Sequence, residues 1–351
     1  MRKYPSLYKM LLFLFLALSL ASCGGNGGTG TTPTSTPSTP GRLTDQPGTG
    51  PKGLPLYCPL AVTVDHQDTI YVSDNDNSMV HERIIKLSAT GQELGEWHLF
   101  PPGSIGRVQG PGSSAFDAQG NMYVADLGRY KVLKVSPDGK ILTSWGSYGS
   151  GQGQFEQPLA VAVDSHDNVY VGDNELDSTR VEKFSGTGTF LGIVLTQVRP
   201  QRSNGFTDFN PIGLAVDSSD NLYVANDVYV TKLSPTGQTL GKMQITDYTS
   251  KIVRIWAGLS INARGDLYAT HLTFADGSFY PRIMKIDVAT GKVLTVWNIW
   301  KSGNNLVKSI AFDSQGNLYA TEMTKTGATL LQKFSATGES LATWQGACSS
   351  S

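Results

Sequence analysis

Residues Gly146 to Asp173 read GSYGSGQGQFEQPLAVAVDSHDNVYVGD, and this stretch decides the fold. It contains a Gly-rich connection, an apolar strand, a tight turn and a second strand. Small and bulky apolar residues alternate in LAVAV, which indicates a strand that is buried on both faces. The Asp and Asn residues that follow tolerate a positive φ, so the chain can reverse tightly there. The stretch therefore predicts a hairpin in the core of an all-β protein.

The same unit recurs through the chain. Its first strand ends at Asp65, Asp117, Asp164, Asp217, Asn262 and Asp313. A Tyr lies six positions after each of these, at Tyr71, Tyr123, Tyr170, Tyr223, Tyr268 and Tyr319. A Lys occupies an equivalent place in the third strand, at Lys86, Lys134, Lys183, Lys232, Lys285 and Lys333. The fourth strand ends in a Trp in some copies, at Trp97, Trp145, Trp297 and Trp344. Repeats of about 50 residues with four strands each predict a six-bladed β-propeller of four-stranded antiparallel blades.

Two blocks of the repeat, the Gly-rich GQFEQP-LAVAVD segment and the NxYVAD segment, resemble the NHL-repeat family. The resemblance covers Pro59 to about Gly346 and implies an NHL-like propeller. It weakens in the fifth copy, where Asn262 replaces the Asp and Trp256 stands in place of a Pro. The connection between the second and third strands is also longer there. We expect blade five to be the variable blade.

The N-terminal residues have the order of charges and apolar residues of a targeting segment. Arg2, Lys3 and Lys9 precede an apolar run that ends in Leu20-Ala21-Ser22-Cys23, which resembles the lipobox of bacterial lipoproteins. We expect residues 1–22 to be a lipoprotein signal peptide and Cys23 to carry the lipid; an ordinary signal peptide is the alternative. Residues 23–57 are a flexible tether rich in Gly, Ser, Thr and Pro, 58–348 the propeller and 349–351 a tail. The expected location is extracytoplasmic, anchored to a membrane of the cell envelope.

The charge balance argues against one class of partner. Without Arg2, Lys3 and Lys9, the chain keeps 25 of its 28 Lys and Arg residues against 29 Asp and Glu. A nucleic-acid-binding domain normally presents a basic face. We expect no nucleic-acid partner, and a monomer.

Two cysteines flank the predicted propeller. Cys58 precedes the first strand of blade one and Cys348 follows the last strand of blade six. In a closed ring of antiparallel blades these two ends meet, so we expect a Cys58–Cys348 disulfide, which an oxidising compartment permits. Two free thiols are the alternative.

Candidate binding residues lie in the variable connections. The short turns after the first and third strands share one face, so the variable loops share the other, and rigid scaffolds usually carry binding on such loops. The aromatic and basic residues expected there are Tyr148, Arg199, Arg202, Phe206, Phe209, Phe279, Tyr280, Arg282 and Trp300. Such residues are frequent in interfaces. They indicate an envelope protein, a peptide or a glycan as the partner.

An enzyme is the alternative, because propellers that resemble NHL repeats include metal-dependent lactonases and a lyase. A metal would then use the residues nine positions after each repeat marker: Asp74, Asp126, Asp173, Asn226, His271 and Glu322. Oxygen ligands favour Ca²⁺, and His also suits Zn²⁺. However, the second strand lies off the axis, and local hydrogen bonds are the simpler role for these residues. The positions expected at the axial entrance offer no metal site: Leu60, Gly112, Leu159, Ile212, Ala257 and Lys308. We therefore expect no cofactor, assign no catalytic residue, and favour a binding scaffold.

Overall fold

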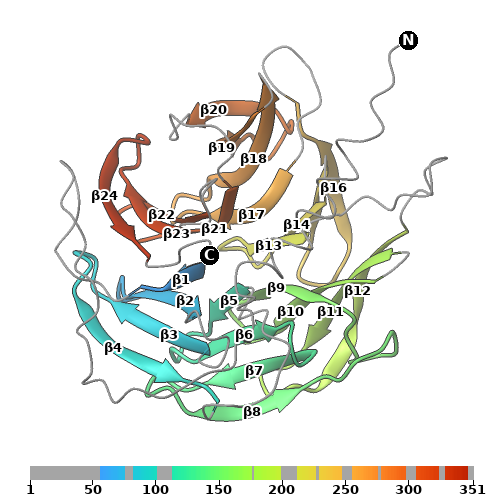
Figure 1. Cartoon of the computed structure of the whole chain (residues 1–351). Coiled ribbons are helices and arrows are strands. Elements are labelled where there is room, and N and C mark those ends of the chain that lie inside the picture. The colour runs from blue at the N-terminus through green and yellow to red at the C-terminus, as the bar shows by residue number, and fades with distance from the viewer. Residues whose placement is uncertain are drawn as a thin grey trace, which may run out of the picture.

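The computed structural model describes residues 56–75, 82–100, 113–175, 178–198, 212–226, 229–246, 255–275, 278–297, 306–323 and 329–346. These residues form 24 strands in six four-stranded sheets. Each sheet contains four consecutive strands in chain order, and neighbouring strands are antiparallel (Figure 1). The predicted all-β, six-bladed propeller is confirmed. The predicted signal peptide, the predicted lipidation site Cys23 and most of the predicted tether lie outside the described residues.

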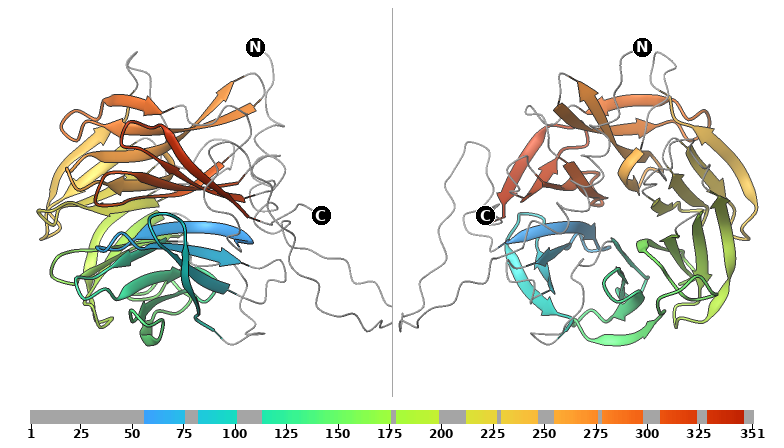
Figure 2. Two further views of the ribbon diagram at one scale, coloured as in Figure 1. Left: turned by 90° about the vertical axis from the view of Figure 1, so that its left-hand side faces the viewer. Right: turned by 45° about the vertical axis from the view of Figure 1, so that its right-hand side comes forward.

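The strands occupy equivalent places in every blade, from the axis to the rim shown in Figures 1 and 2. The first strands are β1 (Cys58–Val64), β5 (Ser113–Phe116), β9 (Pro158–Val163), β13 (Ile212–Val216), β17 (Ile255–Ile261) and β21 (Leu306–Phe312). The second strands are β2 (Ile70–Asn75), β6 (Met122–Asp126), β10 (Val169–Asn174), β14 (Leu222–Asn226), β18 (Leu267–Ala275) and β22 (Leu318–Met323). The third strands are β3 (Glu82–Leu87), β7 (Lys131–Val135), β11 (Ser178–Phe184), β15 (Tyr229–Leu233), β19 (Ser278–Ile286) and β23 (Thr329–Phe334). The fourth strands are β4 (Glu93–His98), β8 (Ile141–Trp145), β12 (Phe190–Val198), β16 (Thr239–Gln244), β20 (Val293–Trp297) and β24 (Ser340–Gln345).

The hydrophobic core is divided among the contacts between neighbouring blades. Each of six apolar clusters combines side chains from two adjacent blades, including a cluster that joins blade six to blade one. In the cluster between blades two and three, Val132 and Tyr123 pack with Val171 and Phe184. Both faces of each sheet are thus buried, which explains why the first strands alternate small and bulky residues instead of polar and apolar ones.

The Trp that ends a fourth strand packs against a Gly in the next blade. An added Cβ at Gly139, in the turn between the third and fourth strands of blade two, would lie 2.4 Å from Trp97 of blade one. The same contact joins Trp145 to Gly188, Trp297 to Gly338 and Trp344 to Gly91. Only Gly leaves room for the indole ring and adopts the positive φ of 82–89° at these turns. The recurrent Trp is therefore a contact between blades.

Among the described residues, side-chain contacts close the ring, and each sheet keeps four consecutive strands. Ser309 of β21 donates from Oγ to the Val62 carbonyl of β1 at 3.2 Å and accepts from the Val62 N–H at 3.3 Å. Lys333 donates to the Ala89 carbonyl at 3.0 Å. At the last described residues, Thr329 donates to the Tyr57 carbonyl at 3.3 Å, next to Cys58. Cys348 lies outside the described residues, so its pairing with Cys58 stays a prediction.

Every fourth strand contains a β-bulge at the same place. In blade one Lys86 pairs with Gly95 and Leu87 with Glu93, which leaves Leu94 without a register partner. The equivalent unpaired residues are Leu142, Leu191, Leu240, Leu294 and Leu341. These six Leu side chains are 46–58% exposed. The bulge is thus a repeated feature of the outer rim.

Candidate functional site

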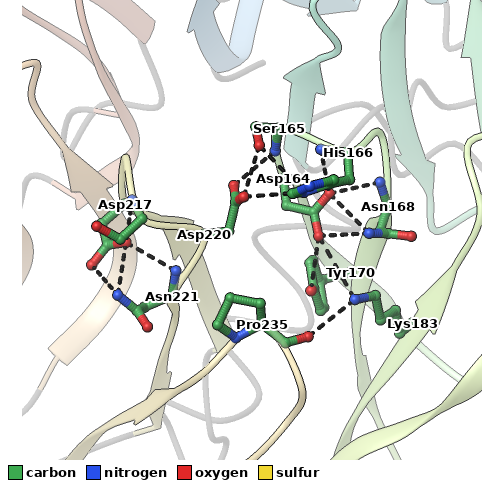
Figure 3. A network of polar contacts seen from close by, with 11 residues as sticks. Asp164, Ser165, His166, Asn168, Tyr170, Lys183, Asp217, Asp220, Asn221 and Pro235 are labelled. Carbon is green, nitrogen blue, oxygen red and sulfur yellow. Dashed lines mark hydrogen bonds and ion pairs between the residues drawn. The ribbon is translucent and has the colours of Figure 1, made fainter.

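The recurrent Asp, Tyr and Lys form a structural unit in the short turns. In blade three, Asp164 Oδ1 accepts the N–H groups of His166 at 3.0 Å and Asn168 at 2.8 Å. Its other oxygen accepts the Tyr170 hydroxyl at 3.1 Å and lies 3.7 Å from Lys183 Nζ (Figure 3). Lys183 also donates to the Pro235 carbonyl of blade four at 3.2 Å. The unit therefore closes its own turn and ties it to the next blade.

In blade five the Asp and the Asn of this turn have exchanged positions, and the turn keeps its hydrogen bonds. Asn262 replaces the Asp, and Asp266 stands where other blades have Asn121, Asn168, Asn221 or Asn317. Lys285 then lies 2.8 Å from Asp266, and Asn262 still accepts the N–H groups of Arg264 and Asp266 at 3.0 Å. Because the carboxylate has moved within the same turn, the departure in this copy is compensated and does not mark a site.

Ser165, His166 and Asp220 meet on the short-turn face and have the residue types of a hydrolase triad (Figure 3). However, Ser165 Oγ donates to Asp220 Oδ2 at 2.7 Å, and His166 Nδ1 lies 3.2 Å from the same oxygen. A nucleophilic Ser requires a His base between itself and the carboxylate. Burial raises the pKa of Asp220, but the hydrogen bonds from Ser165 and the charge of His166 outweigh it, so the net shift is downward. The group is a link between blades three and four, repeated by Ser314 and Asp68 between blades six and one.

The six residues nine positions after the markers take part mostly in local contacts. Asp74 accepts the Tyr57 N–H at 3.0 Å and pairs with Arg83 at 2.8 Å. Asp126 pairs with Arg129 at 3.0 Å, and Asn226 donates to Gln197. Asp173 belongs to a buried charged cluster in blade three.

His271 and Glu322, the last two of these six residues, lie in blades five and six. His271 is opposite Arg282 in the register, and Glu322 is buried opposite Leu330. Across the described ranges, no group of three or more His, Cys, Asp or Glu side chains is arranged to hold a metal ion.

A buried charged cluster in blade three holds the Gly-rich connection. Arg180 donates to the carbonyls of Ser150 and Gln154 at 2.6 Å each, and its guanidinium lies 3.1 Å from Asp173 and 3.0 Å from Glu175. Asp173 in turn accepts the N–H groups of Glu156 and Gln157 at 3.0 and 2.7 Å. Burial raises the pKa of Asp173 against the effect of these bonds. The cluster therefore anchors the loop between Ser150 and Gln157.

Glu182 completes this cluster and was not expected from the sequence. Its Oε1 accepts the Gly153 N–H at 3.3 Å and lies 3.9 Å from Arg180. Burial raises the pKa of Glu182 to about 7; Arg180 opposes the shift, while Asp173 and Glu175 add to it. The sequence does mark Glu182, because it is the charged residue at a position that is uncharged in the other blades. The equivalent residues are Ile85, Leu133, Thr231, Met284 and Gln332.

Tyr148 is the most exposed of the predicted binding residues whose burial the structure describes. Its side chain is 66% exposed, and its ring lies 4.9 Å from that of Tyr130, at an angle of 63°. Tyr130 follows β6 in the loop face of blade two and has a φ of 57°. This left-handed conformation is rare for a bulky residue, and no local sequence pattern predicts it.

Three of the remaining binding candidates, Phe279, Tyr280 and Arg282, lie in β19 of blade five, and the others lie outside the described residues. β18 and β19 pair over nine positions, so the hairpin extends past His271 and carries the partly buried Tyr280 and Arg282. The backbone of Phe279 pairs with Phe274 there. The expected variability of blade five thus takes the form of a longer hairpin. Arg199, Arg202, Phe206, Phe209 and Trp300 lie outside the described residues.

A channel of about 550 Å³ runs along the axis between the first strands of all six blades. Its walls are mostly small or apolar, and its polar lining residues are Thr63, His66, Ser113, Ser114, Ser260, Lys308 and Ser309. Among the described residues that line it there is no carboxylate. Lys308 and His66 are the ionisable side chains among these described lining residues.

Six such blades around an axial channel define the protein as a six-bladed β-propeller. No protein-family model matches the chain. The human NHL repeat-containing protein 3 is 24% identical over 187 residues, which are 50% of this chain and 50% of the relative. The chain thus spans about half the length of the curated relative that it matches. This similarity and the fold support a relation to NHL-repeat proteins.

Solved structures with a similar fold have diverse descriptions. Virginiamycin B lyase from Staphylococcus aureus has a TM-score of 0.51 and 13% identity, with 86% of each chain covered. A protein of unknown function from Bacteroides caccae has a TM-score of 0.52 and 12% identity, with 75% of this chain and 89% of that chain covered. At such identities the likeness shows the fold alone. Within the described ranges there is also no helix with the length and apolar character to cross a membrane.

Proposed function

We propose that the protein is an extracytoplasmic, lipid-anchored scaffold whose loop face binds an envelope protein, peptide or glycan. The observation that carries this proposal is the rigid display of Tyr148 on a loop that Asp173, Arg180 and Glu182 hold from below. A pre-ordered aromatic side chain loses little conformational entropy on binding, which makes it a favourable anchor for a partner.

The sequence at the N-terminus supports the location. Cys23 follows the lipobox-like Leu20-Ala21-Ser22, and the residues up to 57 have the composition of a flexible tether. A lipid on Cys23 would hold the propeller near a membrane without a membrane-spanning segment. Metabolic labelling with an alkynyl fatty acid should mark the wild type and not Cys23→Ser. A chain that reaches the membrane without label would contradict the anchor.

Binding by the propeller is tested separately from anchoring. In a chain that carries Cys23→Ser and an ordinary cleavable signal peptide in place of residues 1–22, association with the envelope fraction comes from the folded domain. Tyr148→Ala, combined with Tyr280→Ala and Arg282→Ala on the blade-five hairpin, should release it. Ser218→Ala, an exposed change on the short-turn face, is the matched control. Equal retention of both variants would contradict binding through these loops.

Metal analysis bears on the enzymatic alternative. We expect the dialysed mature protein to contain less than stoichiometric Ca²⁺ or Zn²⁺. One retained equivalent would favour a metal-dependent lactonase-like or lyase-like enzyme instead.

A further inference from the structure

We propose that Tyr148 and Tyr130, with the polar side chains of the loop beside them, form a binding site for a neutral saccharide. This inference rests on the proposed role of the loop face and names the class of ligand. The site is the segment 147–155 together with Tyr130.

The segment is ordered before any ligand arrives. Tyr148 and Phe155 form a parallel bridge, and the Phe155 N–H donates to the Ser147 carbonyl at 2.8 Å. The Gln154 side chain accepts the Gly151 N–H at 3.0 Å. Phe155 is fully buried between blades two and three, where it packs with Phe184. With the Arg180 contacts to its carbonyls, the loop is a fixed platform.

Two aromatic rings from different connections meet on this platform. Tyr148 comes from the connection between blades two and three, and Tyr130 from the loop between β6 and β7. The edge-to-face contact at 4.9 Å supports the Tyr148 ring and leaves much of its surface open. A left-handed φ is unfavourable for a residue such as Tyr130 that carries a Cβ. The chain maintains that conformation, and with it the contact between the two rings.

The loop segment beside the rings is polar and uncharged. Residues 146–155 contain no Asp, Glu, Lys or Arg. Ser150 and Gln152 are exposed, and neither side chain hydrogen-bonds to another described residue. Two basic side chains near the loop are already engaged: Arg180 with Asp173 and Glu175, and Arg129 with Asp126 and the Phe100 ring at 3.5 Å.

This combination matches the chemistry of a sugar ring. The C–H face of a pyranose packs on an aromatic ring, while its hydroxyls exchange hydrogen bonds with hydroxyl and amide groups. A strongly acidic or basic ligand would find no unpaired opposite charge in residues 146–155. The neutrality of the loop therefore favours an uncharged saccharide over a charged peptide.

The test uses the full propeller domain with its tether and an array of neutral oligosaccharides that includes glucans, mannans, xylans and chitooligosaccharides. We expect binding to at least one neutral series, with a loss of about tenfold or more in Tyr148→Ala, which corresponds to about 1.4 kcal/mol. Tyr148→Phe should retain binding. Leu191→Ala removes another exposed apolar side chain, on the rim, and should bind like the wild type.

The variant Tyr130→Gly tests whether the contact between the two rings serves saccharide binding or the stability of the fold. Gly relieves the left-handed strain, so its thermal stability should equal or exceed that of the wild type, while saccharide affinity falls. The absence of binding to every neutral series, binding confined to charged glycans, or unchanged affinity in Tyr148→Ala would each overturn the inference. If the array shows no binding while the envelope association still depends on the loop face, the scaffold stands and only the saccharide class is wrong.

Discussion

Asp167 shows how a single missing hydroxyl leaves a polar atom unsatisfied. Ser165 and Ser314 each donate to an Asp of the following blade, Asp220 and Asp68 respectively. At the equivalent contact between blades two and three the Ser position is Ala118, and the buried Asp167 Oδ1 has no hydrogen-bond partner among the described residues. Ala118 is therefore a position where one added hydroxyl, next to Asp167, would stabilise the contact between blades two and three.

We predict that Ala118→Ser raises the free energy of unfolding by about 1 kcal/mol, because the new hydroxyl satisfies Asp167. Ala263→Ser is the matched control, since the next blade presents Gly316 at the acceptor position. Chemical denaturation of both variants measures the effect. Equal stabilities for the two would contradict the account.

Glu182 makes stability depend on pH. Its pKa is about 7 in the folded protein, against about 4.5 when unfolded, so the folded state holds the proton more tightly. Its contribution to stability is full below pH 4.5 and is lost as the pH rises to about 7. Glu182→Gln should remove this part of the pH dependence and raise the melting temperature at pH 8.

Glu339→Gln, which changes an exposed side chain, should keep the pH profile of the wild type. Thermal unfolding between pH 4.5 and 8 compares the three proteins. A profile for Glu182→Gln that runs parallel to the wild type would show that Glu182 does not titrate in this range.

At the level of elements, the turn between the third and fourth strands joins one blade to the next. Gly139→Ala places a Cβ against Trp97, whereas Gly237→Ala at the equivalent turn of blade four meets only Val194 at 3.7 Å. Both have a φ near 84°, at 85° and 83°, so the strain of a left-handed Ala is the same. We expect Gly139→Ala to be the more destabilising by about 1–3 kcal/mol, measured by urea denaturation. A larger loss in Gly237→Ala would contradict the role of the Trp contact.

The strands, turns and repeat boundaries could be predicted from the sequence because their signals are local and repeated. The Asp164 and Tyr170 spacing reflects a contact within one hairpin, and Asp65 to Tyr71 repeats it. The loop platform could not be predicted in the same way. Arg180 reaches Ser150 across 30 positions, and the meeting of Tyr130 with Tyr148 depends on an unusual backbone conformation. Contacts between connections of different blades leave no periodic signal in one sequence.

For the whole molecule, the contact between blade six and blade one is where the first and the last described blades meet. The hydrogen bonds of Ser309, Lys333 and Thr329 close this contact, and the predicted Cys58–Cys348 disulfide would add about 2–4 kcal/mol by constraining the unfolded chain. The double variant Cys58→Ser/Cys348→Ser should lose about that much stability.

Thiol alkylation under denaturing, non-reducing conditions provides the chemical check on the mature chain. We expect no modified thiol at these two positions before reduction and two after it. Two modified thiols without reductant would contradict the disulfide.

The bulges at the six outer strands have a consequence for behaviour at high concentration. A propeller leaves the last strand of each sheet with unpaired backbone groups, and such edges can add strands from other molecules. An extra residue at Leu94 and its five equivalents interrupts the regular spacing of donors and acceptors that an incoming strand would need. The bulges thus oppose edge-to-edge addition of strands from neighbouring copies, although each of the six described sheets carries an exposed Leu on its outer strand.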